Sequence, residues 1–208
     1  NKDERTMSKT VPGPDGQPRC GWCGEIAEFF PYHDAEWGFP VADDIRLFEK
    51  LCLESFQSGL SWRTILAKRE NFRRAFHGFD YEKVAEFTEA DVERLLQDAG
   101  IIRHRGKIEA VINNAKRARE LIAQEGSLAA YVWRFEPDPA SLGDPQSAST
   151  SAESIALSKD LKKRGWKFVG PTTVFAFMQA MGLVNDHMAD CVTRDAVARA
   201  RKGFTPPR

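Results

Sequence analysis

The chain has 208 residues, of which 42% are hydrophobic and 29% are charged, and its 30 basic residues balance its 30 acidic ones. Such a mixture is typical of a soluble globular protein, and no apolar run reaches the ~20 residues of a membrane span. The zero net charge argues weakly against a nucleic-acid binder, and four cysteines are too few for a disulfide scaffold, which favours a reducing cytoplasm.

The chain begins with a polar segment. Residues 1–18 contain proline and glycine and lack the apolar stretch of a secretory signal, so we expect a flexible tail. Residues 203–208 are expected to form a C-terminal tail.

Helical signals fill the sequence after the first tail. Apolar residues spaced near 3.6 predict a helix over residues 43–60, with Asp43 or Asp44 as its N-cap and Gly59 as its end. A second helix is predicted over residues 61–76.

Four more helices are predicted in the middle of the chain. Asp80 can cap the first of them, and Thr88–Asp91 resembles a capping box that opens the second, which Gly100 closes. The third is long, from Arg105 to Gln124. The first helix is short and spans residues 81–87, and the fourth is also short and spans residues 127–135.

The last third begins with a loop over residues 137–150, rich in proline, glycine and serine. A helix over 151–165 follows, and an almost wholly apolar segment over 172–183 predicts a buried central helix. Residues 185–202 should form the last helix. Because alternation of β-branched residues is nearly absent, the sequence predicts an all-α fold of about ten helices.

Cysteine and histidine residues cluster near both ends. Cys20, Cys23 and His33 lie close together in sequence, and His187 and Cys191 are four residues apart, on one face of the predicted last helix. Zinc prefers four nitrogen or sulfur ligands in a tetrahedron. The set Cys20, His33, His187 and Cys191 fills that tetrahedron, which predicts a structural zinc site tying both ends of the fold together.

Alternatives to this set remain open. Cys23 could replace His33, but we prefer His33 because Asp34 or Glu36 could orient its ring. A redox role for the Cys20–Cys23 motif would need a preceding strand, and the sequence predicts none. The clustering could also be accidental, with buried cysteines and hydrogen-bonded histidines.

Aromatic residues and one acid mark a second candidate site. The N-terminal third carries Trp22, Phe29, Phe30, Tyr32, Trp37 and Trp62, which are most simply explained as core. Glu54 lies near the end of an otherwise apolar helix, where a carboxylate needs a partner or a function. It could cap a helix or pair with an arginine.

Basic residues gather in four runs despite the neutral total. They could form a basic face or lie singly on solvated helices. The runs are Glu70–Arg74, Arg103–Lys107, Ala115–Arg119 and Lys162–Lys167.

Several stretches, taken together and in order, closely resemble the 3-methyladenine DNA glycosylase I family of the helix-hairpin-helix glycosylase superfamily. The resemblance runs from Arg19 to Cys191, and only the two tails and the 137–150 loop fall outside it. The stretches are RCGW, YHDAEWG, LESFQSGLSW, DAGIIRHRGKI, LKKRGWKFVGPTT and FMQAMGLVNDHMADC.

The resemblance implies a fold and a ligand set. Residues 19–202 should form one compact domain of two lobes, in which the terminal segments build the lobe with zinc and the middle helices build the other. Cys23 should be an extra thiol. The implied zinc ligands are again Cys20, His33, His187 and Cys191.

The resemblance also implies a base pocket between the lobes. Glu54, as the catalytic residue, and Tyr32 match the pair that hydrogen-bonds the damaged base. Trp22, Trp62 and Trp37 match the stacking aromatic residues. The DNA hairpin should be Lys167–Thr173, with a tight turn at Val169–Gly170, and we expect it to hold a phosphate through its backbone, with charge added by Lys163 and Arg164. Its binding residues are Lys167, Val169, Gly170, Thr172 and Thr173.

The implied activity is excision of 3-methyladenine from alkylated double-stranded DNA, by a monomer in a bacterial cytoplasm, near the nucleoid. Thr172 stands where bifunctional relatives have a lysine, which predicts hydrolysis without strand cleavage. Asn185 stands where the superfamily often has an aspartate, with Asp186 adjacent. Three other interpretations are a zinc-stabilised DNA-binding module, a thiol oxidoreductase and an inactive relative.

A selectivity hypothesis follows from this chemistry. Adenine methylated at N3 carries a positive charge within the nucleotide, so an aromatic slot beside a lone anion, Glu54, would favour it over normal adenine. Glu54 would also accept a hydrogen bond from the amine of adenine, whereas guanine presents a carbonyl there.

Overall fold

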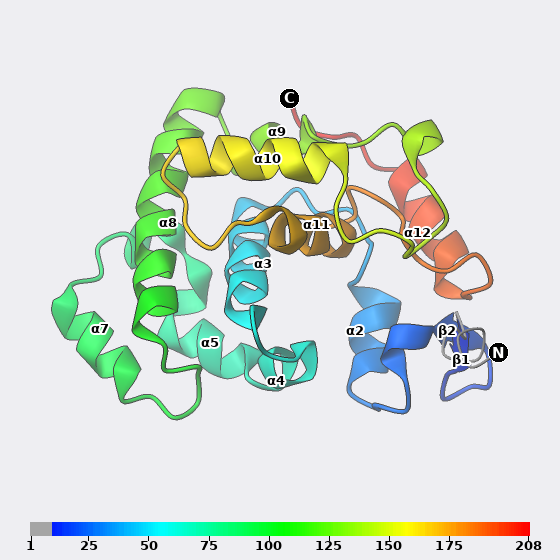
Figure 1. The fold of residues 1–208 in the computed structure, drawn as a ribbon, viewed down its shortest axis with the longest axis horizontal. Coiled ribbons are helices and arrows are strands. Elements are labelled where there is room, and N and C mark those ends of the chain that lie inside the picture. Colours follow the sequence, from blue (N-terminus) through cyan, green and yellow to red (C-terminus); the bar gives the residue numbers. More distant parts are fainter. Residues whose placement is uncertain (1–9) are drawn as a thin grey trace. The chain divides into compact units, whose positions relative to one another are not determined.

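The computed structural model describes residues 10–208, and that part of the chain is mostly helical (Figure 1). It contains eleven α-helices, α2 to α12, and one pair of short strands. The prediction of an all-α fold with about ten helices is confirmed. Within residues 10–208 there is no helix whose length and apolar content would let it cross a bilayer.

The chain divides into two compact units. The first unit comprises the described residues up to Pro40, together with Glu136–Ser149 and Met178–Thr205. The second comprises Val41–Phe135 and Thr150–Phe177, with the last three residues of the chain.

The first unit opens with a β-hairpin where the sequence predicted a flexible tail. Strands β1 (Thr10–Pro12) and β2 (Pro18–Cys20) pair antiparallel, so the tail prediction is wrong for residues 10–18, and residues 1–9 lie outside the described part. The missed signal is the turn, where Gly16 adopts φ +80° and Asp15 pairs with Arg19 at 3.0 Å.

Two α-helices and one 3-10 turn follow in the first unit. They are the 3-10 turn η1 (Gly21–Cys23), α2 (Phe29–Ala35) and α12 (Thr193–Lys202). The prediction of a helix over 185–202 is wrong for its first half, because residues 185–192 form a loop. The backbone N–H of Val192 donates to Pro18 O at 2.9 Å and that of Cys191 to Met188 O at 3.0 Å, so these groups are satisfied without helical bonds.

The second unit holds most of the helices. Their starts follow the predicted caps, since the Asp43 carboxylate accepts from Arg46 N at 2.8 Å and Thr88 forms a capping box with Asp91. The bounds are α3 (Asp44–Gln57), α4 (Trp62–Ala67), α5 (Arg69–Ala75), α6 (Tyr81–Val84), α7 (Glu89–Leu96), α8 (Arg105–Glu125), α9 (Leu128–Trp133), α10 (Ala152–Lys163) and α11 (Pro171–Ala180), the last of which ends in the first unit.

Two of these helices depart from prediction. The helix expected over 61–76 is split at Lys68, whose φ of −98° and ψ of 2° lie outside the helical range. Helix α7 stops at Leu96 rather than continuing to Gly100. The apolar helix α11 is buried as predicted, with Val174 and Phe177 almost fully shielded from solvent.

A buried lysine fixes the end of α3. Lys107 of α8 is 7% exposed, and its ammonium donates to Phe56 O at 2.9 Å and to Ser58 O at 2.6 Å. These are carbonyls of the last turn of α3, which the helix itself leaves unsatisfied. Burial lowers the pKa of Lys107. The bonds hold the segment that joins Glu54 on α3 to Trp62 on α4.

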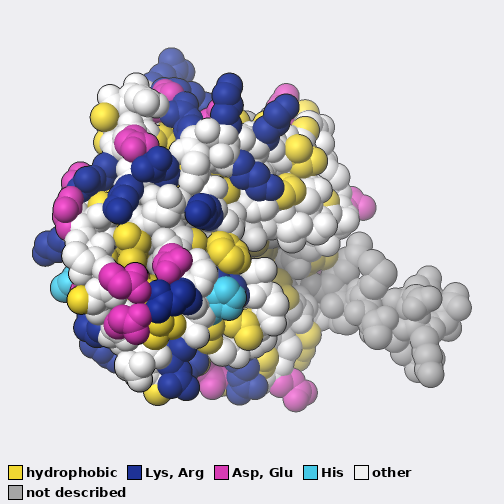
Figure 2. All heavy atoms as spheres, turned by 60° about the vertical axis from the view of Figure 1, so that its left-hand side comes forward, with side chains coloured by type: hydrophobic (Ala, Val, Ile, Leu, Met, Phe, Trp, Pro, Cys, Tyr) yellow, Lys and Arg dark blue, Asp and Glu magenta, His cyan; other side chains and the backbone are white. Residues whose placement is uncertain are grey.

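Two of the basic runs contain an arginine that is held by neighbouring acids. Arg105 lies within 3.1 Å of Glu89, Glu93 and Glu109, and Arg119 lies 2.6 Å from Glu86. On the face drawn in Figure 2, basic and acidic side chains are accordingly interleaved. Arg105 and Arg119 therefore add little free positive charge to the surface.

Candidate functional site

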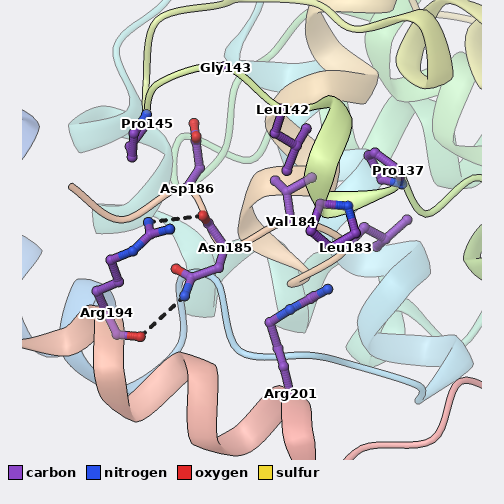
Figure 3. A pocket seen from close by; sticks show the side chains of 11 residues that line it. Pro137, Leu142, Gly143, Pro145, Leu183, Val184, Asn185, Asp186, Arg194 and Arg201 are labelled. Carbon is purple, nitrogen blue, oxygen red and sulfur yellow. Dashed lines mark hydrogen bonds between the residues drawn. The ribbon is translucent and has the colours of Figure 1, made fainter. Parts of the chain in front are cut away.

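Asn185 and Asp186, at the position of the superfamily's aspartate, border a cavity of about 300 Å³ in the first unit (Figure 3). The Asn185 amide donates to Arg194 O at 3.2 Å. The two carboxylate oxygens of Asp186 accept from Gln146 N at 3.0 Å and Gln179 Nε2 at 2.7 Å. Both side chains are thus engaged in holding the loops of this unit together.

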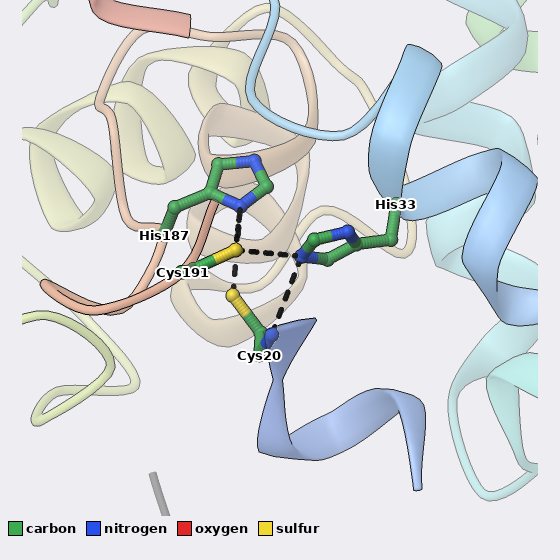
Figure 4. Close-up of side chains that lie close together, drawn as sticks. All are labelled: Cys20, His33, His187 and Cys191. Atoms are coloured by element: carbon green, nitrogen blue, oxygen red, sulfur yellow. Dashed lines mark hydrogen bonds between the residues drawn. The ribbon is translucent and has the colours of Figure 1, made fainter. Parts of the chain in front are cut away.

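Four side chains from distant parts of the sequence converge in the first unit (Figure 4). Their ligating atoms all lie within 4.8 Å of one another, and all four residues are buried. Cys20 is the last residue of strand β2, His33 lies on α2, and the other two lie on the loop before α12 rather than on a helix. The residues are Cys20, His33, His187 and Cys191, the set predicted from the sequence.

Hydrogen bonds fix which nitrogen of each imidazole faces the cluster. His33 Nδ1 lies 2.7 Å from Asp34 Oδ1, and His187 Nε2 lies 2.7 Å from Trp37 O. Both acceptors require a ring N–H, so the opposite nitrogens, His33 Nε2 and His187 Nδ1, present lone pairs to the cluster. Asp34 is the orienting carboxylate that the sequence suggested.

The donor distances fit a tetrahedral metal. Bond lengths of about 2.3 Å to sulfur and 2.0–2.1 Å to nitrogen place sulfur and nitrogen ligands about 3.5 Å apart in a tetrahedron. The Cys191 sulfur lies 3.4 Å from His33 Nε2 and 3.6 Å from His187 Nδ1, and the Cys20 sulfur lies 3.5 Å from His187 Nδ1. The cluster can therefore hold a metal ion.

The thiols of Cys191 and Cys23 differ in pKa because their surroundings differ. Hydrogen bonding from Cys20, together with contacts to both imidazoles, holds the pKa of Cys191 well below its usual value. Cys23 lies outside the cluster, and burial raises its pKa to about 12. A thiol so hard to ionise is a poor redox nucleophile.

Glycine and tryptophan enclose the cluster. Gly38 adopts φ +91°, and a Cβ there would lie 3.0 Å from the His187 ring, so only glycine lets the backbone approach it. The Trp37 ring is buried against both imidazoles, 4.8 Å from His187 between centroids. Trp22 packs at 5.3 Å from Trp37 and 6.2 Å from Tyr32. In this unit Trp37 therefore forms part of the wall of the cluster.

Glu54 has a cationic partner that the sequence analysis missed. Lys50 precedes it by one helical turn on α3, and its ammonium lies 3.0 Å from Glu54 Oε1. The same ammonium lies 3.5 Å from the centroid of the Trp62 ring. Lys50 and Glu54 are only 5% and 7% exposed. The description of Glu54 as a lone anion is therefore wrong, although the four-residue spacing already indicated the pair.

Within the second unit, the segment between α10 and α11 is held to neighbouring helices through its backbone carbonyls. Asn114 makes two bonds to the backbone of Lys167, to its N–H and its C=O, each at 2.9 Å. Ser55 Oγ lies 2.8 Å from Phe168 O, and Ser158 Oγ donates to Val169 O at 2.7 Å. No sequence signal identified these three polar residues.

This segment also differs from the expected hairpin in detail. The left-handed residues are Gly165 and Phe168, whereas Gly170 has an ordinary φ. The Val169 side chain is fully buried, so it can contribute only its backbone. Arg164 is bound to Asp160 and Glu125, whereas Lys163 and Lys167 are exposed and have no ion-pair partner within residues 10–208.

Comparisons with known proteins agree on one family. The family model for methyladenine glycosylase matches residues 22–194. DNA-3-methyladenine glycosylase 1 of Escherichia coli (strain K12) is 52% identical over 178 residues, which are 83% of this chain and 95% of that protein. The DNA-3-methyladenine glycosylase of Haemophilus influenzae is 48% identical and is covered to 96%.

Solved structures give the same result. A structure that explains 3-methyladenine recognition by 3-methyladenine DNA glycosylase I from Staphylococcus aureus matches with a TM-score of 0.80 and 38% identity, over 85% of this chain and 96% of that one. A crystal structure of another 3-methyladenine DNA glycosylase I matches with a TM-score of 0.78 and 48% identity, over 84% and 98% of the two chains.

Proposed function

The chain belongs to the methyladenine glycosylase family, and on that premise we propose that it excises 3-methyladenine from alkylated DNA and so starts base excision repair. It is an enzyme that acts on the N-glycosidic bond. The observation that carries this conclusion is 52% identity to a DNA-3-methyladenine glycosylase along 95% of that protein's length.

The reaction needs little acid–base assistance. Water attacks C1′ of the sugar, the C1′–N9 bond breaks, and its electron pair neutralises the positive charge of the methylated base, which leaves neutral. The proton lost by water passes to solvent. The protein must therefore extrude the nucleotide, at a cost of roughly a few kcal/mol, and hold it for attack.

We assign the base contacts by resemblance to the family. Tyr32 and Glu54 would hydrogen-bond the base, and Trp22 and Trp62 would stack on it. Because Lys50 neutralises Glu54, the pair carries no net charge and does not itself attract a cation. Glu54 would therefore only accept a hydrogen bond from the adenine amine. The preference for 3-methyladenine over normal adenine would rest on the weaker glycosidic bond of the methylated nucleotide and on cation–π attraction.

The DNA backbone would bind at the segment between α10 and α11. Its carbonyls are turned toward α3, α8 and α10, and Asn114 also holds the N–H of Lys167, so the backbone N–H groups that follow Lys167 are the ones that would meet a phosphate. A Cβ on Gly170 would meet nothing within 4 Å, so the protein itself does not require glycine there, whereas an approaching phosphate would. Lys163 and Lys167 would add charge, and Thr172 and Thr173 would add hydroxyl groups.

Replacing Asn114 by alanine should weaken binding of undamaged duplex DNA by about tenfold, because two buried bonds that shape this segment are lost. Asn71→Ala is the matched control, since its amide donates to Gly100 O at 3.0 Å, outside this segment. Fluorescence anisotropy at fixed salt measures both. If both variants lose the same amount of affinity for DNA, Asn114 does not act on DNA binding through this segment.

Incubation with methylated DNA should release free 3-methyladenine and leave the strand intact, because Thr172 offers no amine for a Schiff base. Chromatography of the released base and a denaturing gel of the DNA measure the two products. Binding without release would instead identify a DNA-binding module. Strand cleavage, or a complex trapped by borohydride, would contradict the monofunctional mechanism.

We further propose that the metal of the Cys20, His33, His187 and Cys191 cluster is zinc and that it is structural. Four protein ligands complete its tetrahedron, so no position is open for a catalytic water. Its chemistry is to hold thiolates and imidazoles together. Residues 19–202 would act as one monomeric domain, in the cytoplasm of a bacterium such as those that contain the relatives.

A further inference from the structure

Lys50 is a buried cation that the mechanism has not used. Its ammonium contacts the Glu54 carboxylate at 3.0 Å and the Trp62 ring at 3.5 Å, so it touches two of the residues assigned to the base. Removing a charge from water is costly, and such a pair is kept only with good geometry or a function. Sequence resemblance assigned nothing to this position.

The ion pair determines what Glu54 can recognise. A carboxylate only accepts hydrogen bonds, whereas a protonated carboxyl group also donates one. The amine of adenine donates, and the carbonyl of guanine at the same position accepts. An ionised Glu54 therefore discriminates between the two purines, and a neutral Glu54 does not.

The geometry around Lys50 maintains the ionised form. The ammonium lies 3.0 Å from Oε1 of the carboxylate, so a cation stands directly beside the group that is assigned to the base. The Trp62 ring and the surrounding core hold the ammonium in place by cation–π attraction and packing.

We propose that Lys50 is a specificity-determining residue: by pairing with Glu54 it keeps that side chain an acceptor and so sets the preference for methylated adenine over methylated guanine. This inference rests on the proposed function, in which Glu54 contacts the base. Lys50 acts through Glu54 and is a positioning residue, not a catalytic one.

The test compares two lesions in one DNA sample. DNA treated with a methylating agent contains both 3-methyladenine and 3-methylguanine, and single-turnover release of each is followed by chromatography. In Lys50→Met, which keeps the length and apolar volume of the side chain, we expect the ratio of the two rates to fall by about tenfold, the scale of one hydrogen bond to a charged group. Lys50→Arg retains the positive charge and should keep most of the ratio.

The ratio is insensitive to partial unfolding, because both lesions meet the same folded molecules. If Lys50→Met lowers both rates equally, Lys50 is merely structural and the inference is overturned. An unchanged ratio with unchanged rates overturns it as well. Failure of the unaltered protein to release either base would instead refute the proposed function.

Discussion

Cys191→Ala should purify without its metal and should unfold at a temperature lower by about 10 °C or more. The Cys191 sulfur contacts both imidazoles of the cluster, at 3.4 and 3.6 Å, so its removal leaves three ligands and a buried gap. Mass spectrometry or elemental analysis measures the metal, with one zinc ion expected for each unaltered chain. Calorimetry measures the unfolding temperature.

The expected effect is large because the metal closes a long loop. Cys20 and His187 are 167 residues apart in sequence, and a metal ion bound in the cluster would join them directly. The unfolded chain has no such preformed site, so the free energy of binding adds to the free energy of folding. In the first unit, the loop before α12 and the hairpin of β1 and β2 make few other helical or sheet bonds to replace it.

Cys23→Ala provides the control. Cys23 is as buried as the ligands but lies outside the cluster, so this variant should keep its metal and lose only the packing of one sulfur atom. Loss of the metal from Cys23→Ala but not from Cys191→Ala would show that the ligand set is wrong. A metal-free unaltered protein of full stability would show that no structural ion is needed.

Local signals in the sequence were sufficient for most helices and for the metal cluster. Asp43, Thr88 and the long amphipathic segment of α8 carry caps and periodicity that act within a few residues, and the structure follows them. The metal set could be chosen because soft ligands are rare in this chain and their chemistry is restrictive.

The features that could not be predicted from the sequence depend on partners that are distant along the chain. The segment from Asn185 to Val192 has helical composition, yet its backbone bonds to Pro18 and to the Cys20 sulfur, which are distant in sequence. Asn114 likewise carries no local mark of its two bonds to Lys167, 53 residues away. Lys50 was the avoidable omission, since its place one turn before Glu54 is visible in the sequence.

Glu54→Gln should lower single-turnover release of 3-methyladenine by about 100-fold, since a hydrogen bond from the base to a charged acceptor becomes a weaker one to an amide. This substitution alone is ambiguous, because it leaves the Lys50 ammonium buried without its carboxylate. Breaking a buried pair in this way costs about 3–5 kcal/mol of stability. Lost activity could then reflect a loosened fold.

The double variant Lys50→Met/Glu54→Gln separates the two effects. Replacing both members of a buried ion pair by residues of similar volume is often nearly neutral, so we expect its free energy of unfolding in urea to return to within about 1 kcal/mol of the unaltered protein. Its activity should stay as low as that of Glu54→Gln, because the carboxylate is still absent. Recovery of activity together with stability would show that Glu54 serves the fold alone, since a residue that recognises the base cannot be replaced by repairing the packing around it.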